Sequence, residues 1–440
     1  MRRPAPERRL VVSDAIAAPL TPGSVGAWSP WRTVVGFGVV SLAADMVYEG
    51  ARSVTGPLLA SLGASAVLVG LVSGAGEATA LMMRLVFGSW ADRTKSYWPL
   101  TFAGYALTAV CVPALAITPF LAGAGLALAC VLILGERLGK AVRSPAKTAL
   151  LAHAASAVGL GRGFGVHQAL DQVGAVAGPV LVAAMAAAAG TLWPAMAVLI
   201  IPAAISMIIL VWIWRRNMGT HATDGEDPDS TETAASSERR ESLLSSLHGR
   251  LPGVFWLFAA ASAAISAGLV TFAVIAYHLT QDHVVGVAVV PLIYAAAMGA
   301  GSLAALGSGW LFDRTRGGAL LGLPLIVSAV PVLAFASSPL VAIAGALLWG
   351  AAGGVLDSTI KALVADLVPA PRRATAYGVF AAVQGAAAVA GGVMAGALYE
   401  RSLPMLIAAV IATQIVALAL LLATLRRQRR MRAEAVTGAD

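Results

Sequence analysis

The sequence carries ionisable residues inside long apolar stretches, and in hydrocarbon each such charge costs about 2.5 to 3.5 kcal/mol. Asp45, Glu49 and Arg52 are spaced by four and three residues, which places them on one face of a helix. Two carboxylates one turn apart repel each other, so one of them is expected to bind a proton near neutral pH. The alternative is a silent ion pair of Arg52 with either carboxylate, which only offsets the cost of burial.

Further charges gather in the first half of the chain. His167 and Asp171 lie one helical turn apart and suit a proton relay, because imidazole titrates near physiological pH. A hydrated polar pair near a helix start is the alternative for these two residues. Proton coupling or recognition of a charged solute is therefore predicted to involve Asp45, Glu49, Arg52, Glu77, Arg84, His167 and Asp171.

Two pairs of opposite charge recur at a spacing of four residues, one in each half of the chain. Glu136 stands four residues before Lys140, and Asp357 stands four residues before Lys361. Side chains at this spacing are neighbours on a helix, so each pair is predicted to be an ion pair inside the membrane. Such pairs offset the cost of burial, and a role in gating is the alternative.

The elements that carry these residues read as membrane-spanning helices. Of the 440 residues, 58% are hydrophobic and 12% are charged, whereas an ordinary soluble domain has roughly a quarter charged. We predict an all-α integral membrane protein of 12 transmembrane helices in two pseudo-symmetric six-helix bundles. The predicted spans are 34–61, 66–89, 97–118, 120–143, 164–188 and 191–214, then 254–279, 284–309, 319–337, 340–367, 375–399 and 403–425.

A polar stretch and the basic residues set the domain plan. Lys and Arg gather in alternate loops, and the opposite side has only Arg401, so both termini are expected in the cytosol of a bacterium, with the bundles in its cytoplasmic membrane. The predicted domains are a cytosolic tail 1–31, a six-helix bundle 32–214, a cytosolic linker 215–251, a second six-helix bundle 252–425 and a cytosolic tail 426–440.

Other functional classes find no support in the sequence. The net charge of +8 comes from residues at the ends of apolar stretches, where they orient helices, so nucleic acid is not an expected partner. The sequence contains no phosphate-binding loop, no nucleophile elbow and no metal-ligand spacing of His and Cys. We therefore expect neither an enzyme, nor a cofactor, nor a metal site.

An internal repeat carries a family resemblance. The stretch from Gly88 to Lys95 (GSWADRTK) matches that from Gly309 to Arg316 (GWLFDRTR). Both resemble the signature loop of the major facilitator superfamily, which follows the second and the eighth helix. The resemblance implies alternating access between two related bundles. It also implies gating roles, with simple helix capping as the alternative, for Gly88, Asp92, Arg93, Gly309, Asp313 and Arg314.

A second element resembles the antiporter motif of exporters in that family. It comprises Gly174, Gly178 and Pro179 in the predicted fifth helix. Glycines four residues apart let helices approach closely, and a proline adds a bend. The resemblance favours export, although helix packing alone would also explain these glycines.

We therefore predict a secondary transporter, working as a monomer in the lipid bilayer, whose partners are protons and a small-molecule substrate. Proton-coupled export (antiport) of a small organic compound by alternating access is the favoured activity. One alternative is a proton-coupled importer of a charged metabolite, with Arg52 or Arg84 binding an anionic group. The other is a membrane receptor or scaffold that does not transport.

Overall fold

The computed structural model describes residues 29–221, 251–315, 318–368 and 372–437. Within these ranges the secondary structure is helical and contains no strand. Eleven helical stretches of this described part are long and apolar enough to cross a membrane, and Leu320–Ala334 is a shorter apolar helix. The predicted all-helical membrane architecture is thereby confirmed.

The two halves repeat a similar succession of long helices, several of them interrupted. The first half comprises α1 (Pro30–Ser53), α2 (Thr55–Ser61), α3 (Ala66–Thr94), α4 (Tyr97–Ala114), η1 (Leu115–Phe120), η2 (Ala122–Ala124), α5 (Gly125–Ser156), α6 (Leu160–Ala189), α7 (Leu192–Ala197) and α8 (Ile200–His221). The second half comprises α10 (Gly253–Gly268), α11 (Phe272–Gln281), α12 (Val290–Thr315), η3 (Gly318–Gly322), α13 (Leu323–Ala334), α14 (Pro339–Leu367), α15 (Arg373–Arg401) and α16 (Leu403–Thr437).

Three predicted spans, 34–61, 191–214 and 254–279, are each divided between two α-helices in the structure. The span 34–61 breaks at Val54, whose φ of −122° and ψ of 11° are not helical. The span 254–279 breaks between α10 and α11, where Gln414 of α16 donates a hydrogen bond of 3.2 Å to the carbonyl of Ala264. A carbonyl near a helix end needs such a partner inside a membrane.

The domain boundaries stay predictions, but one helix passes a predicted boundary. Helix α8 continues to His221, beyond the predicted end of the first bundle at residue 214. The apolar stretch ends at Arg215, but a helix can continue beyond the end of an apolar stretch. The remainder of the predicted linker, residues 222–250, lies outside the described residues.

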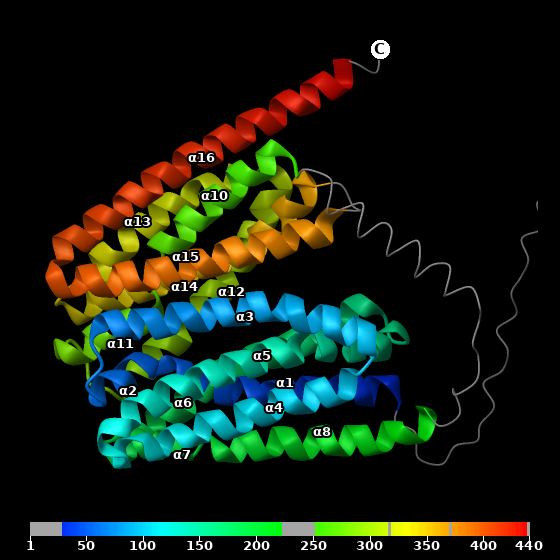
Figure 1. Ribbon diagram of the computed structural model, residues 1–440, viewed down its shortest axis with the longest axis vertical. Helices are drawn as coiled ribbons and strands as arrows, with labels where there is room; N and C mark the ends of the chain where they lie inside the picture. The colour runs from blue at the N-terminus through cyan, green and yellow to red at the C-terminus, as the bar shows by residue number, and fades with distance from the viewer. Residues whose placement is uncertain (1–28, 222–250, 316–317, 369–371, 438–440) are drawn as a thin grey trace, which may run out of the picture.

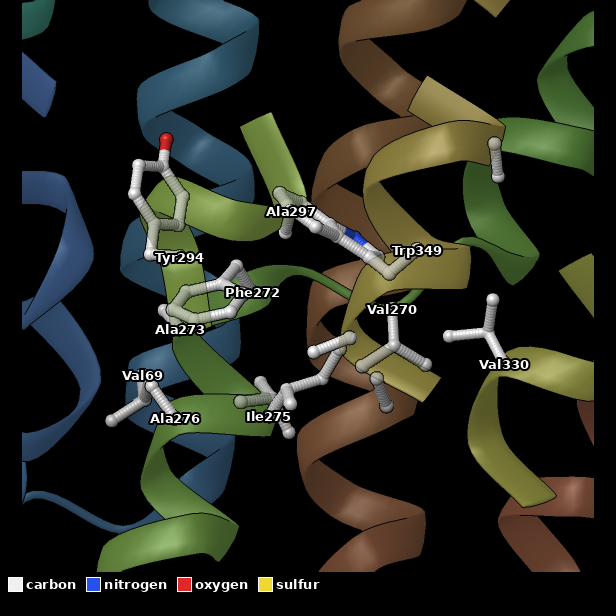
Figure 2. Packing of buried hydrophobic residues seen from close by; sticks show 14 of the residues in the cluster. Val69, Val270, Phe272, Ala273, Ile275, Ala276, Tyr294, Ala297, Val330 and Trp349 are labelled. Carbon is white, nitrogen blue, oxygen red and sulfur yellow. The ribbon is translucent and has the colours of Figure 1, made fainter. Parts of the chain in front are cut away.

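The two halves lie side by side and meet along a seam (Figure 1). Helix α3 packs along α15 at this seam, α6 packs against α12, and α2 packs against α11. Buried apolar residues continue across the seam, because Val69 of α3 shares one cluster with Phe272 and Ala276 of α11 (Figure 2). The halves therefore share a common core near α2 and α11.

Glycines show where the seam is tightest. A Cβ atom added at Gly70 would lie 2.0 Å from the carbonyl oxygen of Gly392, and one added at Gly396 would lie 2.2 Å from that of Ala66. Farther along, a Cβ atom at Gly378 would meet only a side-chain methyl of Leu85, at 3.7 Å. Figure 1 shows the same divergence, since α3 and α15 separate toward the end where the C terminus lies. The halves are thus closed at the end of α2 and α11 and farther apart at the basic end.

Candidate functional site: a charged cluster at the seam

Helices α1, α3 and α5 bring charged side chains together within the first half. Arg52 of α1 donates a hydrogen bond of 2.6 Å to Glu77 of α3, and Arg137 of α5 lies 3.4 Å from the same oxygen. The side chain of Arg137 is 7% exposed, whereas those of Arg52 and Glu77 are 28% and 31% exposed. One carboxylate is therefore shared by two guanidinium groups, and part of this network is exposed.

Tyr48 lies at the centre of these charges. Its hydroxyl accepts hydrogen bonds from Arg52, at 3.2 Å, and from Arg137. The ammonium nitrogen of Lys140 lies 3.5 Å from the centroid of the Tyr48 ring, within the range of a cation–π contact. Tyr48 thus holds three cations from two helices. We use the term central cluster for Tyr48, Glu49, Arg52, Glu77, Arg137 and Lys140.

Glu49 connects this cluster to the second half. It is 8% exposed and accepts a hydrogen bond of 2.5 Å from the hydroxyl of Tyr294 in α12. Within the described residues, neither Glu49 nor Asp45 forms an ion pair. Arg52 instead turns to Glu77, so the predicted alternative of a silent pair on α1 is wrong.

The predicted ion pair of Glu136 with Lys140 is also replaced by other contacts. Glu136 lies 3.7 Å from Arg137, and its other carboxylate oxygen is buried without a hydrogen-bond partner in the described part of the chain. Lys140 prefers the ring of Tyr48, which reaches it from α1. Arg84 interacts electrostatically with Glu77, and its buried Nε atom has no hydrogen-bond partner among the described residues.

The predicted pair of His167 and Asp171 is brought together by α6. The Nδ1 atom of His167 lies 3.5 Å from a carboxylate oxygen of Asp171. Asp171 also interacts electrostatically with Asp45 of α1, so this pair borders the central cluster. Lys147 of α5 fixes the same region by donating a hydrogen bond of 2.6 Å to Ser41.

The predicted gating residues lie away from the cluster, toward the basic end of the molecule. Asp92 and Arg93 are exposed at the end of α3 and form no ion pair with a described residue. Gly88 packs 3.6 Å from Pro145 of α5, measured from an added Cβ atom, whereas Gly309 has nothing within 4 Å.

The gating residues and the ion pair predicted for the second half are only partly described. Arg314 lies over the ring of Trp310 at 3.6 Å, and Asp357 is exposed on α14. The side chains of Asp313 and Lys361 lie outside the described residues. The predicted pair of Asp357 with Lys361 therefore stays a prediction.

The antiporter-like glycines bring α6 against α1. Cβ atoms added at Gly174 and Gly178 would lie 2.3 and 2.2 Å from the carbonyl oxygens of Leu42 and Met46. Pro179 is buried within the same helix. These residues allow the face of α1 that carries Asp45 and Glu49 to be packed closely by α6.

Sequence reasoning missed two features of the site. Tyr294 was recognisable only as an aromatic residue able to stack on a solute or anchor a helix, and Arg137 only as a neighbour of Glu136. Their roles depend on contacts between helices far apart in the sequence, which no spacing reveals.

Comparisons with known proteins agree with this architecture. A family model described as the Major Facilitator Superfamily matches residues 37–326 and 257–439. The chain is 47% identical over 398 residues to an uncharacterized protein of Mycobacterium tuberculosis, covering 90% of this chain and 94% of that protein.

Solved structures show the same fold at low sequence identity. A POT family transporter in complex with 5-aminolevulinic acid is similar with a TM-score of 0.68 and 13% identity, covering 91% of this chain and 96% of that one. The nucleoside transporter NupG is similar with a TM-score of 0.64 and 14% identity, covering 90% and 98%.

Proposed function

The chain belongs to the major facilitator superfamily, and we propose that it is a proton-coupled exporter of a small organic compound. Its family makes it a multi-pass secondary transporter, and alternating access between the two halves is the mechanism that we propose for it. The proposal adds two points to this family assignment, namely that transport is coupled to protons and that it is directed outward.

The buried carboxylate of Glu49 carries the proposal for proton coupling. It is 8% exposed and has no ion-pair partner among the described residues, although Arg52 of α1 and Lys140 of α5 interact with it electrostatically. Burying a carboxylate without a paired cation costs free energy, and binding a proton removes that cost by neutralising the charge. Binding of that proton alters the free energy of closing apolar helices around it.

Two observations bear on direction. The close packing of α6 on α1 through Gly174 and Gly178 supports the resemblance to the antiporter motif and hence export. The importer of a charged metabolite is the second candidate, because Lys140 and Arg84 form no close ion pair with a carboxylate in the described part of the chain and suit an anionic group.

We further propose that the protein is a monomer in the bacterial cytoplasmic membrane with both termini in the cytosol. The basic residues at one end support this orientation. With it, the halves are closed toward the outside and farther apart toward the cytosol, the arrangement from which an exporter loads its solute.

The proposal is tested by measuring accumulation of a chemically diverse compound panel in an efflux-deficient bacterium. Cells with the wild-type protein should accumulate less of the exported compound than cells with an empty vector, and a protonophore should abolish the difference. Glu49→Gln should accumulate as much as the empty vector. The matched control is Asp282→Asn, which removes a carboxylate that is 55% exposed, and should export like the wild type.

Other outcomes separate the alternatives. Higher accumulation than the empty vector would make the protein an importer. Export that persists unchanged in Glu49→Gln would contradict the coupling role of this residue. A receptor or scaffold would show no flux of any compound, in cells or in liposomes, whatever the gradient.

A further inference from the structure

The bond between Tyr294 and Glu49 differs from the other polar contacts described between the two halves. Both of its residues are buried, at 0% and 8% exposure, and the acceptor is a carboxylate. Gln172 of α6 donates to Ser302 of α12, but both of these side chains are neutral. Glu400 accepts from the backbone of Val67 at an exposed position. The bond to Glu49 is therefore the one most sensitive to a proton.

The hydroxyl of Tyr294 is held in place by aromatic packing within the second half. Its ring centroid lies 4.7 Å from that of Phe272 and 6.3 Å from that of Trp349. Phe272 and Trp349 also contact each other, at 5.3 Å (Figure 2). Because the ring cannot follow Glu49 freely, this hydrogen bond requires the two halves to be close together.

The other charges around Glu49 come from the first half. Asp45 and Arg52 share α1 with it, and Glu136 and Lys140 face it electrostatically from α5. These groups move with Glu49 when the halves separate. Tyr294 is the described polar partner that is left behind, so its bond distinguishes the closed seam from the open one.

We propose that Tyr294 is a gating residue that holds the seam closed at the end of α2 and α11 while Glu49 is ionised, and holds it more weakly while Glu49 carries a proton. This inference rests on the proposed proton coupling and deepens it. Hydrogen bonds to a charged acceptor are roughly twice as strong as neutral ones, so protonation of Glu49 weakens the contact.

For transport, this means that a transporter without solute does not readily return to the state that is open toward the outside. An empty transporter with ionised Glu49 stays closed toward the outside, because no bound solute compensates for breaking the charged bond. A proton that arrives from outside neutralises Glu49 before the seam closes, and its release to the cytosol restores the bond. Protons then do not leak through a cycle that carries no solute.

The test measures the seam directly by electron spin resonance. Spin labels are attached to Ser61→Cys, at the end of α2, and Ser402→Cys, directly after α15, in the full-length protein with Cys111→Ala and Cys130→Ala. In the wild-type background, the ratio of the short to the long distance should fall about fivefold between pH 8 and pH 5. In Tyr294→Phe, which keeps the aromatic ring, the ratio at pH 8 should already equal the low value and should not depend on pH.

Two further variants make the result specific. Glu49→Gln should also lose the pH dependence, because its amide cannot ionise. Tyr105→Phe removes the hydroxyl of another buried tyrosine, one that has no hydrogen-bond partner in the described structure, and should behave as the wild type. A normal pH dependence in Tyr294→Phe or in Glu49→Gln would overturn the gating role.

Transport measurements on the same samples in liposomes separate the two proposals. If the distances respond to pH as expected but no proton-driven export occurs, the gating role stands and the proposed function fails. If export is proton-driven but Tyr294→Phe neither changes the distances nor leaks protons, the proposed function stands and the gating role fails.

Discussion

At the scale of single residues, the partner of Arg52 determines how the site is organised. Arg52 reaches Glu77 on a different helix, at 2.6 Å, and leaves both carboxylates of α1 without an ion pair among the described residues. Glu77 thereby becomes the shared ion-pair partner of two guanidinium groups, because Arg137 lies 3.4 Å away. We propose that this network makes Glu77 a structural carboxylate and leaves Glu49 as the carboxylate that exchanges protons.

Glu77→Gln is expected to destabilise the protein. The substitution leaves Arg52 and Arg137 without their shared negative charge, and charged hydrogen bonds contribute about 1.5 to 3 kcal/mol. Since Arg52 and Glu77 are about 30% exposed, we expect the lower end of this range. Thermal unfolding in detergent measures the effect as a lower Tm. Asp92→Asn, which alters an exposed carboxylate on the same helix, is the control, and equal Tm values for the two variants would contradict this role of Glu77.

The residue-scale predictions from sequence placed these residues on the correct helices but assigned only some of their partners. The spacing of Asp45, Glu49 and Arg52 placed them on one helix, and the structure confirms that helix as α1. The pairing of His167 with Asp171 is likewise present. The spacing of residues along one helix does not tell whether a side chain will contact a neighbour on that helix or a residue of another helix. The contacts of Arg52 with Glu77 and of Lys140 with Tyr48 were therefore not predicted.

At the scale of helices, the seam between α3 and α15 depends on the absence of side chains. Gly70 and Gly392 let the two backbones touch near the end of α2 and α11, where the halves are closed. Small residues allow such approaches between membrane helices. The seam can therefore close only if these positions remain without a Cβ atom.

Gly392→Ala is expected to hold the seam open. The new methyl group would lie 2.2 Å from the carbonyl oxygen of Gly70, and neither backbone can move away without separating the helices. The label pair at positions 61 and 402 should then show the long distance at every pH, and transport should stop. Gly353→Ala on α14 has nothing within 4 Å and serves as the control. A short distance retained in Gly392→Ala would show that the seam does not need this contact.

Apolar runs predicted the helices well because lipid leaves few other ways to satisfy a backbone. They did not predict the breaks at Val54 and between α10 and α11. A run of apolar residues has the same composition whether its helix is continuous or interrupted, and the partner that stabilises the second break, Gln414, comes from α16.

At the scale of the whole molecule, the second half contributes little charge to the site that the structure describes. Its contribution is the fixed hydroxyl of Tyr294, backed by Phe272 and Trp349. The internal repeat predicted two related bundles, but their different roles arise from the contact between them. In this account the proton binds to Glu49 in the first half, and the hydrogen bond from Tyr294 in the second half weakens in response.

Solute-driven proton flux in proteoliposomes tests this account most directly. Vesicles loaded with the compound that the accumulation screen identifies contain a pH-sensitive dye, and dilution creates an outward gradient of the compound. The wild-type protein should acidify the vesicle interior as the compound leaves, whereas Glu49→Gln should release the compound without acidification. Acidification by Glu49→Gln at the wild-type rate would contradict the account, because the proton would then travel on another group.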